Sequence, residues 1–263
     1  MPERPEDDPH TLLFVDILGF AALTKRHPTR IVDSGPDEHG FTGSGTSPLQ
    51  TCVVRFQSVI DAILREESLY GGASAMIFSD CAYFDFGNAF RTAVVASGLM
   101  RLFIRAEVPV RMGIGRGTFY GFKYSTESDG QHLITKSLFA GTAVIFAHEA
   151  EQCGEKGCRI FLHPTAEDSL DAIRSQIPVL SLPSSVKNAR YELSYLPHPL
   201  MLKEMDFVHD DDLIEHIQAM AATSEPASPE VQFQYSETLR LLDAMRAAHG
   251  RLPKLTSNDS APR

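Results

Sequence analysis

Two aspartates, Asp16 and Asp80, are the residues best placed to do chemistry. Asp16 ends the apolar run TLLFVD and precedes ILGFAAL, a pattern typical of a buried strand, a glycine turn and a helix. Asp80 separates SAMIFS from AYFDF, two strand-like segments that a tight hairpin would join. Two carboxylates on neighbouring strand ends suffice to bind Mg²⁺ or Mn²⁺ on a phosphorylated ligand, because phosphate oxygens and water complete the coordination.

Each aspartate also has an ordinary structural interpretation. An Asp before a helix commonly accepts a backbone hydrogen bond as its N-cap, which would explain Asp16 without any ligand. An Asp between two strands is a common turn residue, which would explain Asp80. The residues that flank the two acids are what favour a metal site.

Four segments, in order, resemble motifs of the class III adenylate and guanylate cyclase catalytic domain. FVDILGF resembles F-x-D-I-x-G-F, and FSDCAYF resembles the second metal motif, usually G-D followed by aromatics. PVRMGIGRGTFYG is similar to the R-x-G-I-x-x-G strand, and GTAVIFAHE looks like the helix written G-x-x-V-N-x-A-x-R. The resemblance spans about residues 11 to 198.

The resemblance implies a site for two divalent metal ions, Mg²⁺ or Mn²⁺, with no organic cofactor. Asp16 and Asp80 would hold the ions, helped by the carbonyl of Ile17. The ions would lower the pKa of a ribose 3′-hydroxyl, orient the α-phosphate and offset charge on departing pyrophosphate. The backbone at the start of the helix would bind phosphates. That backbone belongs to Ile17, Leu18, Gly19, Phe20 and Ala21.

The family forms active sites between two head-to-tail domains, so one such domain per chain implies a homodimer that binds a nucleoside triphosphate at its interface. The partner helix of the family supplies an Asn and an Arg to the ribose and the reacting phosphorus. The matching residues here are Ile145 and Glu149, a departure from the motif. Four cations are candidates to take over this role: Lys123, Lys136, Lys187 and Arg190.

The expected base pocket is apolar. Purine-specific members place a polar pair on the base edge, and the matching positions here are Met76 and Leu138, with Phe78 beside them. An apolar base pocket together with a divergent partner helix looks like the Pycsar-type pyrimidine cyclases of bacterial antiphage defence. Members of that group make cyclic UMP or cyclic CMP for a separate effector protein. This favours UTP over CTP as substrate. The alternative for Met76 and Leu138 is ordinary core packing.

Two other functions stay open. The first is an adenylate or guanylate cyclase with a divergent pocket. The second is a catalytically silent cyclase-like module that binds a nucleotide or a partner protein, which the replacements Ile145 and Glu149 support. Two acids that repel each other without a cation argue against a silent site.

Alternating strand and helix patterns predict an α/β or α+β sandwich with one mixed sheet covered by helices, and the resemblance implies the α+β class with a ferredoxin-like sheet. Gly113, Gly115 and Gly117 are expected to pack closely within a strand. We expect a flexible N-terminus at 1–10, a catalytic domain at 11–200 with an insertion loop at 26–48, and a helical extension with a polar tail at 201–263. The extension could pack on the domain, extend the dimer interface or contact an effector.

Composition excludes several classes of protein. The formal net charge of −10, without a basic stripe, argues against binding DNA or RNA. No apolar run is long enough to cross a membrane and the N-terminus is polar, so the protein is expected to be cytoplasmic. The four cysteines lack metal-binding spacing and are expected to be reduced thiols.

Overall fold

A computed structural model describes residues 9–27, 47–69, 73–128, 132–174, 177–196, 210–223 and 229–249. Side chains are described throughout most of these ranges, with 122–137 the main exception. Most of the predicted insertion at 26–48, nearly all of the predicted N-terminal segment at 1–10 and the polar tail lie outside the described residues.

The first half of the chain forms a β-α-β-β-α-β unit. Its four strands lie in the order β2-β3-β1-β4 and every neighbouring pair is antiparallel. This is the ferredoxin-like arrangement, so the predicted α+β fold class is confirmed. The elements are β1 (His10–Ile17), α1 (Phe20–Arg26), α2 (Pro48–Leu69), β2 (Ser74–Ile77), β3 (Cys81–Asp85), α3 (Ala89–Arg105) and β4 (Val110–Gly117).

Three more strands extend the sheet beyond β4. β7 (Ile160–Leu162) pairs parallel to β4, which makes the sheet mixed, and β9 and β8 follow in antiparallel pairing. The remaining elements of this region are η1 (Pro164–Ser169), α5 (Leu170–Arg174), β8 (Val179–Ser181) and β9 (Tyr191–Leu193).

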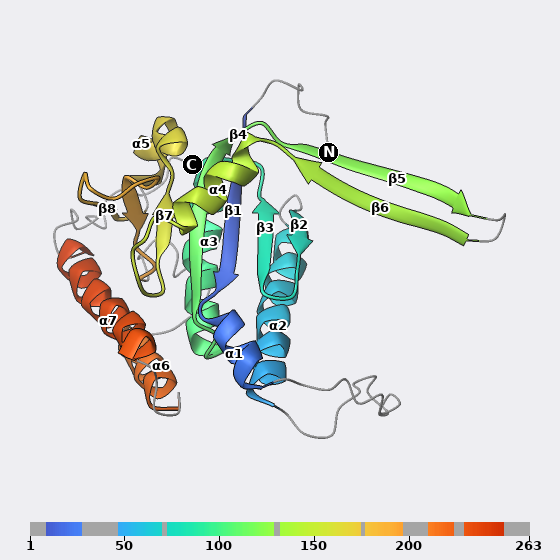
Figure 1. The fold of residues 1–263 in the computed structure, drawn as a ribbon. Coiled ribbons are helices and arrows are strands. Elements are labelled where there is room, and N and C mark those ends of the chain that lie inside the picture. Colours follow the sequence, from blue (N-terminus) through green and yellow to red (C-terminus); the bar gives the residue numbers. More distant parts are fainter. Residues whose placement is uncertain are drawn as a thin grey trace, which may run out of the picture.

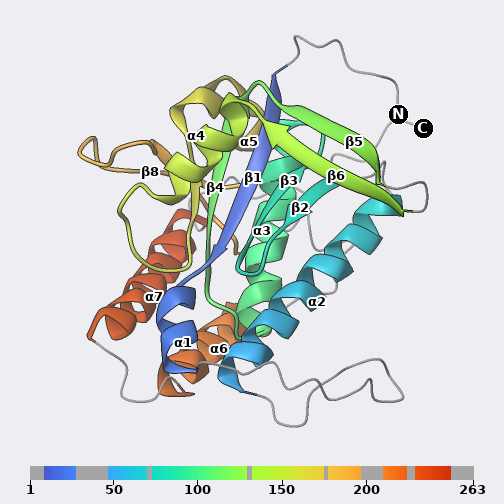
Figure 2. The ribbon, with the colours of Figure 1, turned by 45° about the vertical axis from the view of Figure 1, so that its right-hand side comes forward.

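The two faces of the sheet are covered by different helices (Figures 1 and 2). Side chains alternate along β1, so Leu13 and Val15 join the large core under α2 and α3, whereas Leu12 and Phe14 join a smaller cluster with α4 (Thr142–Glu151). α2 and α3 carry apolar residues at helical spacing and pack on the large-core face. Asp16 follows the alternation of Leu12 and Phe14 and therefore lies on the α4 face.

Glycines let α4 lie directly on β4. A Cβ added to Gly113 would lie 2.0 Å from the carbonyl oxygen of Ala147, and one added to Gly115 would lie 2.3 Å from its amide nitrogen. Any larger side chain would push the helix away from the strand. The predicted close packing of these glycines is confirmed.

A two-stranded ribbon projects from the body of the protein (Figures 1 and 2). It consists of β5 (Tyr120–Ser128) and β6 (His132–Ala140), paired antiparallel and separate from the main sheet. The sequence pattern predicted extended structure before residue 125 but no strand over β6. The mixed polar and apolar composition of QHLITKSLFA does not show the alternation of a half-buried strand.

The C-terminal helices pack on the same core as the sheet. α6 (Asp210–Thr223) and α7 (Pro229–His249) bury Leu213, Ile217 and Leu242 in the core that also contains residues of α3 and β7. Of the three roles that the sequence left open for this extension, packing on the domain is the one observed. No helix in the described part of the chain is long and apolar enough to cross a membrane.

Candidate metal and nucleotide site

The fold brings Asp16 and Asp80 together. β1 lies beside β3 with Asp16 opposite Cys81, the residue that follows Asp80. The amide of Ile17, which follows Asp16, donates a hydrogen bond of 2.9 Å to the carbonyl of Asp80. The two predicted metal acids therefore lie side by side, at the end of β1 and just before the start of β3. In the sequence, α1, α2 and β2 lie between them.

The ordinary structural alternative fails for Asp16 and holds for Asp80. The N-cap of α1 is Gly19, with φ of 75°, and no side chain caps the helix, so the N-cap interpretation of Asp16 is wrong. Asp80 does lie in the tight turn between β2 and β3, which is closed by a 2.8 Å hydrogen bond from the amide of Phe78 to the carbonyl of Cys81. The Asp80 carboxylate accepts a 3.1 Å bond from the Ser79 hydroxyl.

Excess negative charge surrounds Asp16. The pKa of its carboxyl group is raised to about 7, chiefly by burial and further by the carboxylates of Glu151 and Asp80, while Arg111 acts in the opposite direction. A divalent cation would relieve this repulsion, and hard carboxylate oxygens are the ligands that Mg²⁺ and Mn²⁺ prefer. The residues present thus fit such an ion.

Arg111 and Glu151 are the residues that the sequence reasoning missed. Arg111 lies opposite Asp16 in the β1–β4 pairing, and Glu151 is the last residue of α4. The Arg111 Nε donates a 2.6 Å hydrogen bond to the carboxylate of Glu151, a residue that is only 1% exposed. Because the guanidinium is engaged by Glu151, it neutralises Asp16 only in part. A signal was present for Arg111, which lies in the segment PVRMGIGRGTFYG, whereas Glu151 lies two residues beyond the segment GTAVIFAHE.

Within the described residues, no group of three or more His, Cys, Asp or Glu side chains is arranged to hold a metal ion. The candidate is a pair of carboxylates, Asp16 and Asp80. A pair is enough only where phosphate oxygens complete the coordination, so the geometry suits a metal bound to a phosphorylated ligand better than a free structural metal.

The predicted phosphate-binding backbone divides into two parts. The amides of Ile17 and Leu18 are engaged within the protein, since Leu18 donates a 2.9 Å hydrogen bond to the carbonyl of Pro109. Phe20 and Ala21 occupy the first turn of α1, where amides have no acceptor within the helix. Gly19 turns the chain from β1 into that helix.

The three predicted base-pocket residues differ in exposure. Met76 is half-buried and packs against the small α4-side cluster. Phe78 is 46% exposed and Leu138 is 55% exposed, so core packing does not account for either of them. The rings of Phe78 and Phe139 lie 6.1 Å apart, which brings the base of the ribbon beside the β2–β3 turn.

Of the predicted substitutes for the family Asn and Arg, the two whose side chains the structure describes do not lie near Asp16 in one chain. Lys187 and Arg190 are exposed in the segment before β9, three strands away from β1 in the sheet order. Ile145 is 54% exposed on α4, and Glu149 lies 3.5 Å from the Nε2 of His163. The side chains of Lys123 and Lys136 lie outside the described residues.

No protein-family model and no curated protein matches the sequence. Solved structures that resemble the chain include the guanylate cyclase domain of RhGC from Catenaria anguillulae in complex with GTP, with 14% identity over 72% of this chain and 96% of that one and a TM-score of 0.46. The guanylyl cyclase Cya2 shows 16% identity over 72% of this chain and 93% of that one, with a TM-score of 0.42. A class III adenylyl cyclase-like ATP-binding protein from Pseudomonas aeruginosa shows 13% identity over 62% of this chain and 34% of that one, with a TM-score of 0.41. These likenesses are distant, so function has to be inferred from the chain's own residues.

Proposed function

We propose that this protein is a metal-dependent nucleotide cyclase that converts a pyrimidine nucleoside triphosphate, UTP in preference to CTP, into its 3′,5′-cyclic monophosphate and pyrophosphate. The observation that carries the proposal is the meeting of Asp16 and Asp80 on a ferredoxin-like sheet, within segments that resemble the two metal motifs of class III cyclases. Residues 11–200 would form the catalytic domain and 201–263 an extension.

The reaction joins the ribose 3′-oxygen to the α-phosphorus and breaks the bond from that phosphorus to the bridging oxygen of the β-phosphate. Pyrophosphate leaves with the electron pair, and the 3′-hydroxyl proton passes to solvent. Two divalent ions, when bound, supply Lewis acidity at the attacking and departing oxygens. Asp16 and Asp80 hold and orient the phosphate-bound metal, and the first-turn amides of Phe20 and Ala21 offer donors to phosphate oxygens.

The proposed enzyme acts as a homodimer. Two exposed apolar side chains, Leu138 on the ribbon and Ile145 on α4, lie on elements next to the candidate site and favour a protein partner. The described cations Lys187 and Arg190 are remote from Asp16 within one chain. A second copy, related by symmetry, would complete each of two equivalent sites.

An apolar base pocket supports the pyrimidine substrate. Met76, Phe78 and Leu138 offer no side-chain hydrogen-bond donor to the edge of a purine, and an unpaired polar edge loses affinity in a closed pocket. The product would be a cytoplasmic second messenger in antiphage defence, sensed by a separate effector protein. The competing substrate class is a purine triphosphate bound in a rearranged pocket.

The deciding experiment incubates purified protein with Mn²⁺ and each of ATP, GTP, CTP and UTP and identifies products by mass spectrometry. We expect cyclic UMP, with less cyclic CMP, and no product from Asp16→Ala. Preference for ATP or GTP would overturn the proposed pyrimidine specificity but leave the proposed cyclase activity in place. Absence of product from every nucleotide would favour a nucleotide-binding module without catalysis.

The alternative function, a nucleotide-binding module without catalysis, rests on one specific observation. Glu149, at the position where the family motif has Arg, is placed near His163 and cannot stabilise a developing negative charge itself. In a silent module, nucleotide affinity would be the same in wild type, Asp16→Ala and Asp80→Ala. In a cyclase, both variants weaken the binding of a metal–triphosphate complex.

A further inference from the structure

Tyr83 is a buried tyrosine whose hydroxyl has no hydrogen-bond partner in the described part of the chain. The residue is 9% exposed, and its hydroxyl makes no hydrogen bond to any described residue. A buried tyrosine hydroxyl usually finds such a partner, as in the 3.0 Å hydrogen bond from Tyr195 to the carbonyl of Cys158. Because an unpaired buried polar group costs free energy, the Tyr83 hydroxyl is free to pair with a ligand.

The position of Tyr83 connects the predicted base pocket to the candidate metal pair. Tyr83 lies opposite Met76 in the β2–β3 pairing and opposite Phe14 in the β1–β3 pairing. Asp16 lies two positions after Phe14 on β1 and therefore on the same face of the sheet. Tyr83 thus lies between the strand that carries Met76 and the strand that ends at the metal acid.

The side chains around the Tyr83 ring are apolar and aromatic. The centre of its ring lies 4.5 Å from that of Phe14 and 5.6 Å from that of Phe139. The Phe139 ring also lies 6.1 Å from the exposed Phe78. Such surroundings suit a flat neutral ring, whereas a phosphate would lose its hydration among them without gaining a counter-charge.

The Tyr83 phenol is a hydrogen-bond donor at neutral pH. Its pKa is raised to about 12, chiefly by burial and further by Cys81, Glu151 and Asp16. The proton therefore stays on the phenol, which can donate it to an acceptor on a bound molecule.

A pyrimidine base needs a donor that the predicted base-pocket residues do not supply. Met76, Phe78 and Leu138 have no side-chain donor, so the carbonyl oxygens of a bound uracil or cytosine would also be left unpaired. Uracil has two ring carbonyls, cytosine has one and adenine has none. A single tyrosine hydroxyl can therefore pair with a carbonyl of either pyrimidine, and adenine offers it none.

We infer that Tyr83 is a specificity-determining residue whose hydroxyl donates a hydrogen bond to a carbonyl oxygen of the pyrimidine base. The inference rests on the proposed function, in that Met76 is taken as a base-pocket residue. It names the polar contact of that same site and assigns it to β3.

Binding of 3′-deoxy triphosphates tests this contact apart from turnover, because a nucleotide without the 3′-hydroxyl cannot be cyclised. Isothermal titration calorimetry in the presence of Mn²⁺ compares the 3′-deoxy triphosphates of uridine, 2-thiouridine, 4-thiouridine and adenosine. Tyr83→Phe removes only the hydroxyl and keeps the ring contacts. The two thio compounds replace one carbonyl oxygen each by sulfur, which is a weak acceptor.

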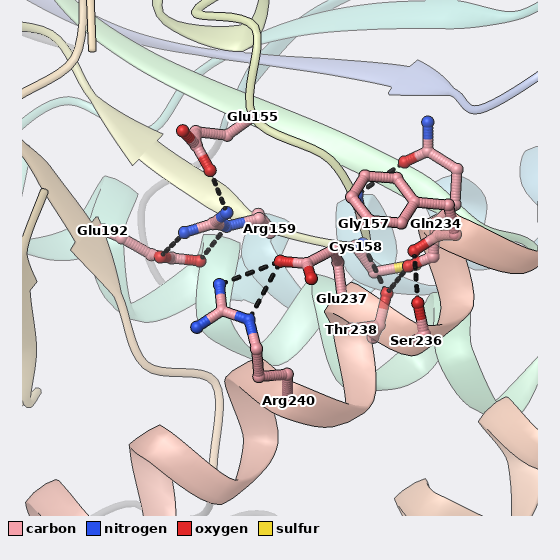
Figure 3. Close-up of polar contacts among 11 residues, drawn as sticks. Glu155, Gly157, Cys158, Arg159, Glu192, Gln234, Ser236, Glu237, Thr238 and Arg240 are labelled. Carbon is pink, nitrogen blue, oxygen red and sulfur yellow. Dashed lines mark hydrogen bonds and ion pairs between the residues drawn. The ribbon is translucent and has the colours of Figure 1, made fainter. Parts of the chain in front are cut away.

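Tyr235→Phe is the matched control. Tyr235 is also 9% exposed, and its hydroxyl likewise makes no hydrogen bond within the described residues. It joins the large core from α7, whose residues Gln234 and Thr238 bond the loop before β7 (Figure 3). The control therefore separates an unpaired hydroxyl as such from one that lies beside the predicted base pocket.

We expect Tyr83→Phe to weaken binding of 3′-deoxy-UTP about three- to tenfold, the usual cost of one neutral hydrogen bond, and to leave 3′-deoxy-ATP unchanged. In wild type, sulfur in place of the contacted oxygen should cause a similar loss, and in Tyr83→Phe the same sulfur should cause none. Tyr235→Phe should bind as wild type does. Without nucleotide, Tyr83→Phe should unfold at the same temperature as wild type or a higher one, since its hydroxyl has no protein partner to lose.

Unchanged affinity for 3′-deoxy-UTP in folded Tyr83→Phe would overturn this inference and leave the cyclase proposal intact. An equal loss for 3′-deoxy-ATP, or in Tyr235→Phe, would also overturn it, because the hydroxyl would then act on the protein and not on a pyrimidine carbonyl. If UTP is not cyclised but Tyr83→Phe still loses 3′-deoxy-UTP selectively, the contact stands and the proposed cyclase activity fails. If wild type binds none of these triphosphates, the inference falls with the nucleotide site.

Discussion

The amide of Ile17 and the carbonyl of Asp80 are joined by a hydrogen bond of 2.9 Å, which links the end of β1 to the β2–β3 turn. Ile17 directly follows Asp16, so the bond holds the backbone next to Asp16 against that of Asp80, the other member of the candidate metal pair. Backbone pairing in the sheet therefore sets how far apart the main chains of Asp16 and Asp80 lie, and side-chain rotamers alone do not. A site held by backbone pairing costs little reorganisation when a metal–nucleotide complex binds.

Removing the carboxylate of Asp80 should strongly reduce metal-dependent turnover. We expect Asp80→Asn to lower kcat/KM by about a hundredfold or more, because a lost charge-stabilising ligand typically costs at least that much. The measurement is product formation from the preferred triphosphate over a range of Mn²⁺ concentrations. Asp85→Asn is the control, since Asp85 lies at the other end of β3 and bonds His10 at 2.8 Å. Equal losses in both variants would contradict a specific role for Asp80.

Asp16 should destabilise the metal-free protein at neutral pH. Its pKa is raised from 3.8 to about 7, so the folded state disfavours the ionised form that the unfolded chain adopts above pH 4. Asp16→Asn should therefore raise the free energy of unfolding, by about 1 to 2 kcal/mol at pH 8 after allowance for solvent screening.

The way in which the stability difference between Asp16→Asn and wild type changes with pH tests whether the raised pKa of Asp16 is its cause. The advantage of Asp16→Asn should grow as pH rises from 5 to about 7, the pKa of the folded state, and then level off. Thermal unfolding in the presence of a chelator measures it. A constant difference between the two proteins across this range would mean that the pKa of Asp16 is not raised.

The contact of α4 with β4 should not tolerate a methyl group. Gly115→Ala would place a Cβ 2.3 Å from the amide nitrogen of Ala147, so α4 or the strand must move. We expect a loss of about 2 kcal/mol or more in chemical denaturation, because overpacking of a core contact costs roughly 1–3 kcal/mol. Gly121→Ala is the matched control, since a Cβ there meets nothing within 4 Å. Similar stability of both variants would show that α4 sits further from the sheet.

The proposed dimer depends on the exposed side of α4. Ile145→Glu places a charge on a side chain that is 54% exposed in the single chain, so it should leave folding intact. It should shift sedimentation toward the monomer and reduce turnover at least about tenfold, because a charge buried in an interface is expensive. Val54→Glu, at a residue 49% exposed on α2, should change neither property. A dimer that survives Ile145→Glu with full activity would place the interface elsewhere.

Local patterns in the chain were sufficient to predict a mixed sheet covered by helices, the strand ends that carry Asp16 and Asp80, and the close packing at Gly113 and Gly115. Each of these depends on residues near one another in sequence, through strand alternation, helical spacing or a turn. The same patterns did not predict β6, which pairs with β5 in a ribbon separate from the main sheet.

Tertiary structure alone decided the surroundings of the acids. Arg111 and Glu151 are in contact because α4 packs on β4, and both lie near Asp16 because β4 pairs with β1. Neither contact can be predicted from the local sequence of β4 or α4. Only the packing of α7 against the loop before β7 brings Gln234 and Thr238 to the amides of Gly157 and Cys158. Such contacts depend on the path of the whole chain, since the pKa of a carboxylate and the partners of a buried arginine are set by residues far away in sequence.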